Sequence, residues 1–276
     1  MSGNFYVCAT PIGNMGDITY RAVEVLSKID CIACEDTRVT RQLTQKYGIN
    51  AKLIDCHKFN EKEKSKKILQ LLSQGLDVAL VSDAGTPLIS DPGCVLIDEL
   101  IKNNIKITAL PGACSLTTFL SLIPRSNEEF AFIGFIPRTK DKQIELLNKY
   151  KFTNCVFFES PLRLLKTLQN ILDEFGSNIK ISVARELTKM FEEIQTGYIS
   201  DVINYFNTNT LKGEIIVMIY SQEQNTSSDN DLLAKIDLLK KEGYSTKDIS
   251  KILSVLFNEN KNKIYELTEK RGNLSL

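Results

Sequence analysis

The chain has 276 residues, of which 43% are hydrophobic and 25% charged, with a formal net charge of zero and a pI of about 6.6. This composition is typical of a soluble globular protein that is long enough for one large core or two ordinary ones. Balanced charge excludes a general electrostatic attraction to nucleic acid, so RNA binding would need a local basic patch. No apolar run could span a bilayer and no leader peptide is evident, which predicts a cytoplasmic protein without a membrane partner.

Seven cysteines and one histidine limit the metal and redox chemistry of the chain. The cysteines are odd in number and scattered through apolar segments, which argues against a disulfide framework. Cys31 and Cys34 form a C-x-x-C motif, but they lie in a predicted strand and no second pair stands at zinc spacing. We expect buried structural thiols and no metal site.

Apolar runs and helical patterns alternate through the first 124 residues. Five short strands are predicted, at residues 6–9, 31–34, 52–55, 78–81 and 105–110. Each is followed by a loop and an apolar-periodic helix. This alternation predicts an α/β domain with a mostly parallel sheet and helices on both faces.

Residues 82–93 follow the fourth strand and hold more turn-forming residues than a plain strand-to-helix connection needs. Open α/β sheets bind small ligands in loops at the carboxyl ends of their strands. Gly85 allows close backbone approach, and the Asp83 carboxylate can accept hydrogen bonds from a ligand. Asp91 and Pro92 predict the N-cap and first residue of the next helix. On turn chemistry alone, a ligand-binding loop and an elaborate tight turn stay equally open.

A charged group, Glu35, Asp36 and Arg38, follows the second strand directly. Thr37 predicts the N-cap of a helix that reaches about Tyr47. One interpretation is structural: the helix dipole favours acids at a helix N-terminus, and the arginine is an ordinary surface residue. A charged rim on a ligand cleft explains the group equally well.

The helix predicted from residue 60 to residue 72 is the most basic segment of the first half. Asn60 and Glu63 predict a capping box at its start. The run is explained by a solvated helix face or, with the cations that precede it, by an RNA-binding patch. The helix carries Lys62, Lys64, Lys66 and Lys67, and the cations that precede it are Arg38, Arg41 and Lys58.

The second half repeats the α/β pattern after a predicted linker at residues 124–127. Further strands are predicted at residues 130–133, 155–158, 179–184, 191–197 and 213–220, and Ser160 and Pro161 predict a helix start. Residues 134–140 combine basic and aromatic side chains, a composition suited to nucleic-acid contact. A polar linker at 222–231 precedes three short helical patterns, at 231–240, 245–256 and 261–270. We therefore predict domains at 1–124, 125–222 and 230–271.

Six runs of residues, mostly at the ends of predicted strands, together resemble the tetrapyrrole-methylase-like family of S-adenosylmethionine-dependent methyltransferases. Within it they resemble the branch that methylates a cytidine ribose in small-subunit ribosomal RNA. The runs are ATPIGNxGDIT at 9–19, AxEDTR at 33–38, SDAGTPxISDPG at 82–93, ESPxR at 159–163, ARELTK at 184–189 and KGE at 212–214. The chain departs from the usual pattern at Leu162 and Phe59, where the family often has histidine, and at Cys114, where a small residue such as serine is common.

The resemblance implies two α/β domains with mostly parallel or mixed sheets, a small C-terminal helical appendage and a homodimer. It implies S-adenosylmethionine as the cofactor, bound between the two domains, and small-subunit ribosomal RNA rather than DNA as the partner. The implied cofactor-binding residues are Pro11, Asp83, Ala84, Gly85, Ala113, Cys114, Phe158 and Gly213.

Transfer to a ribose 2'-hydroxyl needs in-line positioning and help with removal of a proton. The candidate catalytic residues are Glu35, Arg38, Arg185, Glu186 and Lys189. Lys189 or a nearby carboxylate would orient or deprotonate the hydroxyl, and the two arginines would bind phosphate. The alternative is that Glu35–Arg38 and Arg185–Glu186 form interdomain salt bridges. At the level of function, the alternatives are a tetrapyrrole methyltransferase and a non-catalytic RNA-binding assembly factor.

Overall fold

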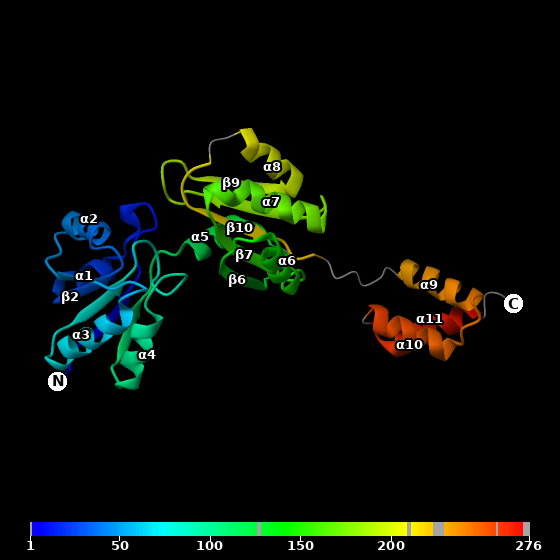
Figure 1. Ribbon diagram of the computed structural model, residues 1–276, viewed down its shortest axis with the longest axis horizontal. Helices are drawn as coiled ribbons and strands as arrows, with labels where there is room; N and C mark the ends of the chain where they lie inside the picture. Colours follow the sequence, from blue (N-terminus) through cyan, green and yellow to red (C-terminus); the bar gives the residue numbers. More distant parts are fainter. Residues whose placement is uncertain (1, 126–127, 209–210, 223–228, 258, 273–276) are drawn as a thin grey trace. The chain divides into compact units, whose positions relative to one another are not determined.

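The computed structural model describes residues 2–125, 128–208, 211–222, 229–257 and 259–272 (Figure 1). The chain forms two compact units, Met1–Ser221 and Gln222–Leu276. The larger unit contains two five-stranded sheets, and we call the parts that carry them the first half and the second half. The predicted linkers lie partly at residues 126–127 and 223–228, outside the described residues, so the domain boundaries stay predictions.

The sheet of the first half is fully parallel, with strand order β3-β2-β4-β1-β5. Its strands are β1 (Phe5–Cys8), β2 (Cys31–Cys34), β3 (Lys52–Asp55), β4 (Val78–Val81) and β5 (Ile107–Leu110). Apolar helix faces bury this sheet from both sides, as expected for parallel strands. Helix α1 (Tyr20–Lys28) packs on one face, and α3 (Glu61–Ser73) and α4 (Cys94–Lys102) pack on the other. Helix α2 (Thr37–Tyr47) follows β2.

The sheet of the second half is mixed, with order β6-β7-β10-β8-β9 and only the β6–β7 pair parallel. Its strands are β6 (Phe130–Phe135), β7 (Asn154–Glu159), β8 (Lys180–Arg185), β9 (Glu193–Tyr198) and β10 (Ile215–Ile219). Helices α6 (Lys140–Lys149), α7 (Pro161–Phe175) and α8 (Ile199–Thr208) cover one face. Helix α5 (Ser115–Leu122) packs against the other face, with Ile12 and Leu187 in the same buried cluster. The predicted α/β class, with a parallel and a mixed sheet, is confirmed.

The smaller unit consists of α9 (Asp229–Lys241), α10 (Thr246–Phe257) and α11 (Lys261–Gly272) around an aliphatic core. The Ser245 hydroxyl accepts a hydrogen bond from the Asp248 amide (3.2 Å), so Ser245 caps α10. Among the described residues of both units, no helix is long and apolar enough to cross a membrane.

Three predicted helix starts are wrong in detail. The cap of α2 is Asp36 rather than Thr37, because the Asp36 carboxylate accepts the Arg38 amide (2.8 Å). Asn60 occupies the N-cap position of α3, but its side chain bonds His57 and Asp55 instead, so no capping box forms. Helix α4 begins at Cys94 with Gly93 as N-cap, two residues later than the Asp91–Pro92 pair predicts.

Candidate active site

The loops after β1 and β4 are joined at the carboxyl edge of the first sheet. Thr10 and Gly85 form an isolated antiparallel bridge, with N–O distances of 2.8 and 3.0 Å. The Thr10 hydroxyl also donates to the carbonyl of Ser82 (3.1 Å). Gly85 adopts a positive φ of 84°, and a Cβ there would lie 3.1 Å from Ile12 Cγ2. This bridge fixes the start of the turn that follows β4.

The rest of that turn, from Thr86 to Gly93, contains strained backbone. Leu88 (φ 72°) and Ser90 (φ 69°) occupy the left-handed region, which is costly for residues with a side chain. Such strain is typical of ligand-binding segments that are over-determined by their surroundings. Asp91 remains in this turn and does not cap α4, whose N-cap is Gly93.

A cavity of about 380 Å³ lies between this turn and the second half. Its volume falls in the range of small-molecule sites. The first half contributes Ile12, Asp83, Ala84, Ile89, Ser90, Asp91 and Ser115, and the second half contributes mainly Phe135, Phe158, Glu159, Ser160, Pro161, Leu187 and Gly213. The two sheets therefore meet around one ligand-sized space.

The first-half wall of the cavity is acidic. Burial, together with the charge of Glu35, raises the pKa of Asp91 to about 6. Burial also raises the pKa of Asp83, whose carboxylate accepts the Asp36 amide (3.0 Å), and burial and Asp83 raise the pKa of Glu35. A bound cation would stabilise the ionised forms of these carboxyls, which burial and mutual repulsion disfavour. In the described part of the chain, no group of three or more histidine, cysteine or acidic residues is arranged to bind a metal ion.

The second-half wall carries an aromatic cluster. Phe135 and Phe158 both line the cavity, with ring centroids 5.3 Å apart, and Phe132 packs edge-to-face on Phe158 at 5.1 Å. Phe135 is 62% exposed although it belongs to β6. An exposed ring backed by two others offers a flat apolar surface to the ring system of a ligand.

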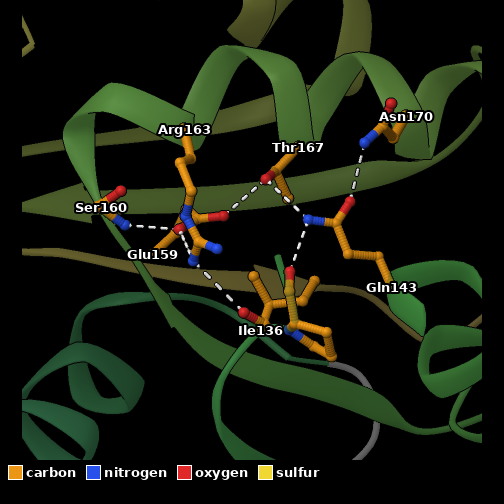
Figure 2. Close-up of polar contacts among 8 residues, drawn as sticks. Ile136, Gln143, Glu159, Ser160, Arg163, Thr167 and Asn170 are labelled. Atoms are coloured by element: carbon orange, nitrogen blue, oxygen red, sulfur yellow. Dashed lines mark hydrogen bonds and ion pairs between the residues drawn. The ribbon is translucent and has the colours of Figure 1, made fainter. Parts of the chain in front are cut away.

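The segment Glu159–Pro161 is fixed by a buried hydrogen-bond network (Figure 2). Glu159 accepts hydrogen bonds from the Ser160 amide (2.7 Å) and the Thr167 hydroxyl (2.6 Å) and forms an ion pair with Arg163. Gln143 and Asn170 extend the network to α6 and along α7. Three donors hold the Glu159 carboxylate at the start of α7, so this wall of the cavity is preorganised.

The loop after β8 bears a second charged group beside the cavity. Lys189 Nζ lies 2.8 Å from Glu186 Oε1 and 3.1 Å from Glu214 Oε2. The Thr188 hydroxyl accepts a hydrogen bond from the Asn14 amide (3.1 Å), and the Lys189 side chain packs over Gly13. This loop therefore contacts the loop after β1 in the first half.

The structure brings half of the predicted cofactor residues to the cavity wall: Asp83, Ala84, Phe158 and Gly213. The others support the wall rather than line it. Gly85 lies in the bridge to Thr10, the Ala113 carbonyl accepts a hydrogen bond from Thr86 (3.0 Å), and Cys114 is the N-cap of α5. Pro11 is buried in the loop after β1.

None of the five predicted catalytic residues lines the cavity. Glu35 interacts electrostatically with Asp83 and Asp91, and Glu186 lies behind Gly213. The predicted alternative of salt bridges is wrong in its partners, because Arg38 pairs with Asp36 (2.6 Å) and Arg185 pairs with Glu193 (2.6 Å).

Sequence reasoning missed Asp91, Ile89, Ser90 and Phe135 as cavity residues. The first three lie in the segment whose turn density drew attention to a ligand site, and Phe135 lies in the aromatic and basic loop that predicts nucleic-acid contact. These two patterns were the available signals. Neither shows which side chain turns inward.

Comparison with known proteins identifies the family. A model of the tetrapyrrole (corrin/porphyrin) methylases matches residues 4–203. The chain belongs to this family. It is thus an S-adenosylmethionine-dependent methyltransferase, as the resemblance predicted.

Curated relatives are named ribosomal RNA small subunit methyltransferase I, and the chain belongs to this family within the tetrapyrrole methylases. The relative from Buchnera aphidicola is 38% identical over 98% of this chain and 97% of its own length. The relative from Escherichia coli O157:H7 is 36% identical over 96% and 94%. The relative from Thermotoga maritima is 41% identical over 80% of this chain and all of its own length.

Solved structures confirm the fold. The methyltransferase CobJ matches with a TM-score of 0.58 at 17% identity, covering 80% of this chain and all of CobJ. Uroporphyrin-III C-methyltransferase from Thermus thermophilus, complexed with S-adenosylhomocysteine, matches with a TM-score of 0.57 at 14% identity, covering 78% of this chain and 97% of that one.

Proposed function

We propose that this methyltransferase methylates the ribose 2'-hydroxyl of a cytidine in small-subunit (16S) ribosomal RNA. The observation that carries the proposal is the identity of 36–38% to ribosomal RNA methyltransferases across 96–98% of the chain. The smaller unit adds the helices of residues 229–272 beyond the region that the family model matches.

The cavity fits S-adenosylmethionine in size and in chemistry. Asp83 and Asp91 would face the cationic part of the cofactor, and Phe135 and Phe158 would pack against its aromatic ring. When bound, the cofactor supplies an electrophilic methyl carbon and a neutral thioether leaving group. The turn 82–93 and the Glu159 network hold these side chains in place before the ligand enters.

In this proposal Lys189 orients the ribose hydroxyl and Glu35 accepts its proton. Burial lowers the pKa of Lys189, but the hydrogen bonds and charges of Glu186 and Glu214 outweigh burial and leave the pKa raised. Lys189 is therefore a cation that donates hydrogen bonds and orients the ribose rather than a base. Glu35, an exposed carboxyl with a raised pKa, is better suited to accept the hydroxyl proton.

Arg38 and Arg185 would bind phosphate on either side of the ribose. The Arg38 side chain is 89% exposed while its guanidinium pairs with Asp36, so it can reach a ligand without first leaving a buried site. A homodimer is also proposed, since Tyr20, Leu162 and Met190 are almost fully exposed apolar side chains. Light scattering at several protein concentrations measures the oligomeric state.

Labelled methyl transfer tests the proposed function. The acceptors are small ribosomal subunits from a strain that lacks this protein and, in parallel, uroporphyrinogen. We expect label in cytidine 2'-O-methyl ribose of the subunit RNA and none in the tetrapyrrole. Label in uroporphyrinogen alone would assign the tetrapyrrole reaction, and RNA binding without calorimetric affinity for S-adenosylmethionine would assign a non-catalytic assembly factor.

A further inference from the structure

Phe59 is an aromatic ring held out into solvent by a fixed turn. Its side chain is 94% exposed. The Asn60 side chain accepts a hydrogen bond from the His57 amide (2.8 Å), and the Phe59 amide donates one to His57 Nδ1 (3.3 Å). The rings of His57 and Phe59 lie edge-to-face, with their centroids 6.2 Å apart. A large apolar group with a hydrogen-bonded backbone and no covering side chain is a preorganised contact surface.

The turn that carries Phe59 lies at the same edge of the sheet as the cavity. Strands β2 and β3 are parallel neighbours with Cys34 opposite Asp55, and the Cys56 amide donates to the Cys34 carbonyl (2.7 Å). The next residues, Glu35 and His57, are close enough that His57 affects the ionisation of Glu35. Glu35 in turn acts on Asp91 in the cavity wall. The turn with Phe59 and the loop after β4 that lines the cavity therefore follow the carboxyl ends of parallel strands in one sheet, with β2 between them.

Exposed positive charge directly precedes this ring in the chain, at Lys58, and lies on α2, which packs against β3, at Arg41. Two acids of this edge are already paired, Asp36 with Arg38 and Asp55 with Lys64 (2.9 Å). Lys58 and Arg41 are exposed and form no ion pair with the residues that the structure describes. Exposed cations beside an exposed ring are the combination that binds a single nucleic-acid strand, in which bases stack and phosphates contact lysine and arginine.

We propose that Phe59 is the stacking platform for an unpaired base of the RNA substrate, adjacent to the nucleotide whose ribose enters the cavity, with Lys58 and Arg41 contacting the phosphates. This inference rests on the proposed function and names how its substrate is bound. A second copy of the chain is the less suitable partner, because charged and polar residues surround the ring and the centre of a protein interface is depleted of charge.

Steady-state kinetics with small ribosomal subunits as substrate tests the platform. Phe59→Ala and Phe59→Leu are expected to raise the KM for the subunit about tenfold, because stacking requires an aromatic face. Phe59→Tyr is expected to keep the wild-type KM. The affinity for S-adenosylmethionine and kcat should change little in all three variants.

Phe152→Ala is the matched control. Phe152 is also an exposed aromatic residue beside a lysine, with Lys151 Nζ 4.8 Å from its ring centroid. It precedes β7, whose other end lines the cavity, so the length of this strand, about 20 Å, separates it from the cavity. Equal KM values for Phe59→Ala, Phe152→Ala and the wild type would overturn the proposal. A loss of dimers in Phe59→Ala without a change in KM would assign the ring to a protein interface and also overturn it.

A fluorescence titration separates this inference from the proposed function. The chain contains no tryptophan, so Phe59→Trp and Phe152→Trp each introduce a single fluorophore. Titration with purified small-subunit RNA should quench the emission of Phe59→Trp and leave that of Phe152→Trp unchanged. Quenching without methyl transfer by the wild type would reject the proposed function and keep the platform, whereas methyl transfer without quenching would reject only the platform.

Discussion

The Glu186 carboxylate packs directly against Gly213. A Cβ at Gly213, which has a φ of +90°, would lie 2.2 Å from Glu186 Cδ. Glu186 Oε1 accepts hydrogen bonds from the Glu214 amide (3.0 Å) and from Lys189 Nζ (2.8 Å). Gly213 therefore forms the cavity wall and also leaves room for the charged pair behind it.

Gly213→Ala should lower stability and abolish methyl transfer. The positive φ costs about 1–2 kcal/mol for a residue with a side chain, and the added methyl group displaces Glu186 as well. Gly176→Ala is the matched control, since Gly176 has a φ of +81° and no atom within 4 Å of its Cβ position. Urea unfolding and activity are measured together. Equal losses in both variants would contradict a role for the Glu186 contact.

Glu35→Gln and Lys189→Met should separate the proton acceptor from the orienting cation. Loss of a general base costs about 10²- to 10⁴-fold in kcat, so we expect Glu35→Gln to fall in this range and Lys189→Met to lose less. Lys102→Met, which removes a surface ion pair on α4, is the control. If Glu35→Gln and Lys189→Met both retained the wild-type kcat, the catalytic assignment would be lost.

The raised pKa of Asp91 predicts that cofactor binding depends on pH. Its pKa rises from the usual 3.8 to about 6, so the free protein holds a proton there below pH 6. A cationic ligand favours the ionised carboxylate, and its affinity should therefore fall as the pH drops below about 6, by at most tenfold per pH unit. Asp91→Asn should bind more weakly at pH 7.5 and lack this slope in calorimetric titrations.

The same raised pKa predicts the stability of the ligand-free protein. A carboxyl whose pKa is raised by folding stabilises the folded state fully below pH 3.8, and this contribution is lost as the pH rises through about 6. Asp91→Asn should therefore raise the melting temperature at pH 7.5 but not at pH 4. Asp201→Asn, at an exposed position on α8, is the control, and parallel pH profiles for the two variants would reject this explanation.

Glu61 connects α3 to the start of α4. Its buried carboxylate accepts the Leu96 amide (2.9 Å), one of the free N–H groups of the first turn of α4. Glu61→Ala should reduce the free energy of unfolding by about 1–3 kcal/mol and leave the affinity for S-adenosylmethionine unchanged. Glu63→Ala, at an exposed position two residues away, should cost far less in urea unfolding.

The contact between Glu61 and Leu96 shows why some element boundaries can be predicted from the sequence and others cannot. Strands 31–34, 52–55 and 78–81 were predicted with the bounds of β2, β3 and β4, because short apolar runs between turn residues are a local signal. The start of α4 is not local, since its cap comes from Glu61, 35 positions before Leu96. The Asp91–Pro92 pair has the local pattern of a cap, but Asp91 lines the cavity and Gly93 takes the N-cap position.

The residues of the candidate site could likewise be predicted only where the signal lies in local sequence or in the family resemblance. Turn density and family resemblance led to Asp83, Ala84, Phe158 and Gly213 at the cavity. The partner of Arg185 could not be derived from its neighbours, because it depends on the register of β8 and β9, which places Glu193 directly opposite. Burial of Asp91 depends on the approach of the second half, which no local pattern encodes.

A crystal structure of the full chain with S-adenosylhomocysteine tests the central claim most directly. We predict that the ligand occupies the cavity between the turn 82–93 and the aromatic pair, with Asp83 or Asp91 facing its amino acid part and Phe135 or Phe158 against its adenine ring. Electron density for the ligand at any other place on the chain, with side chains filling this cavity, would contradict the claim.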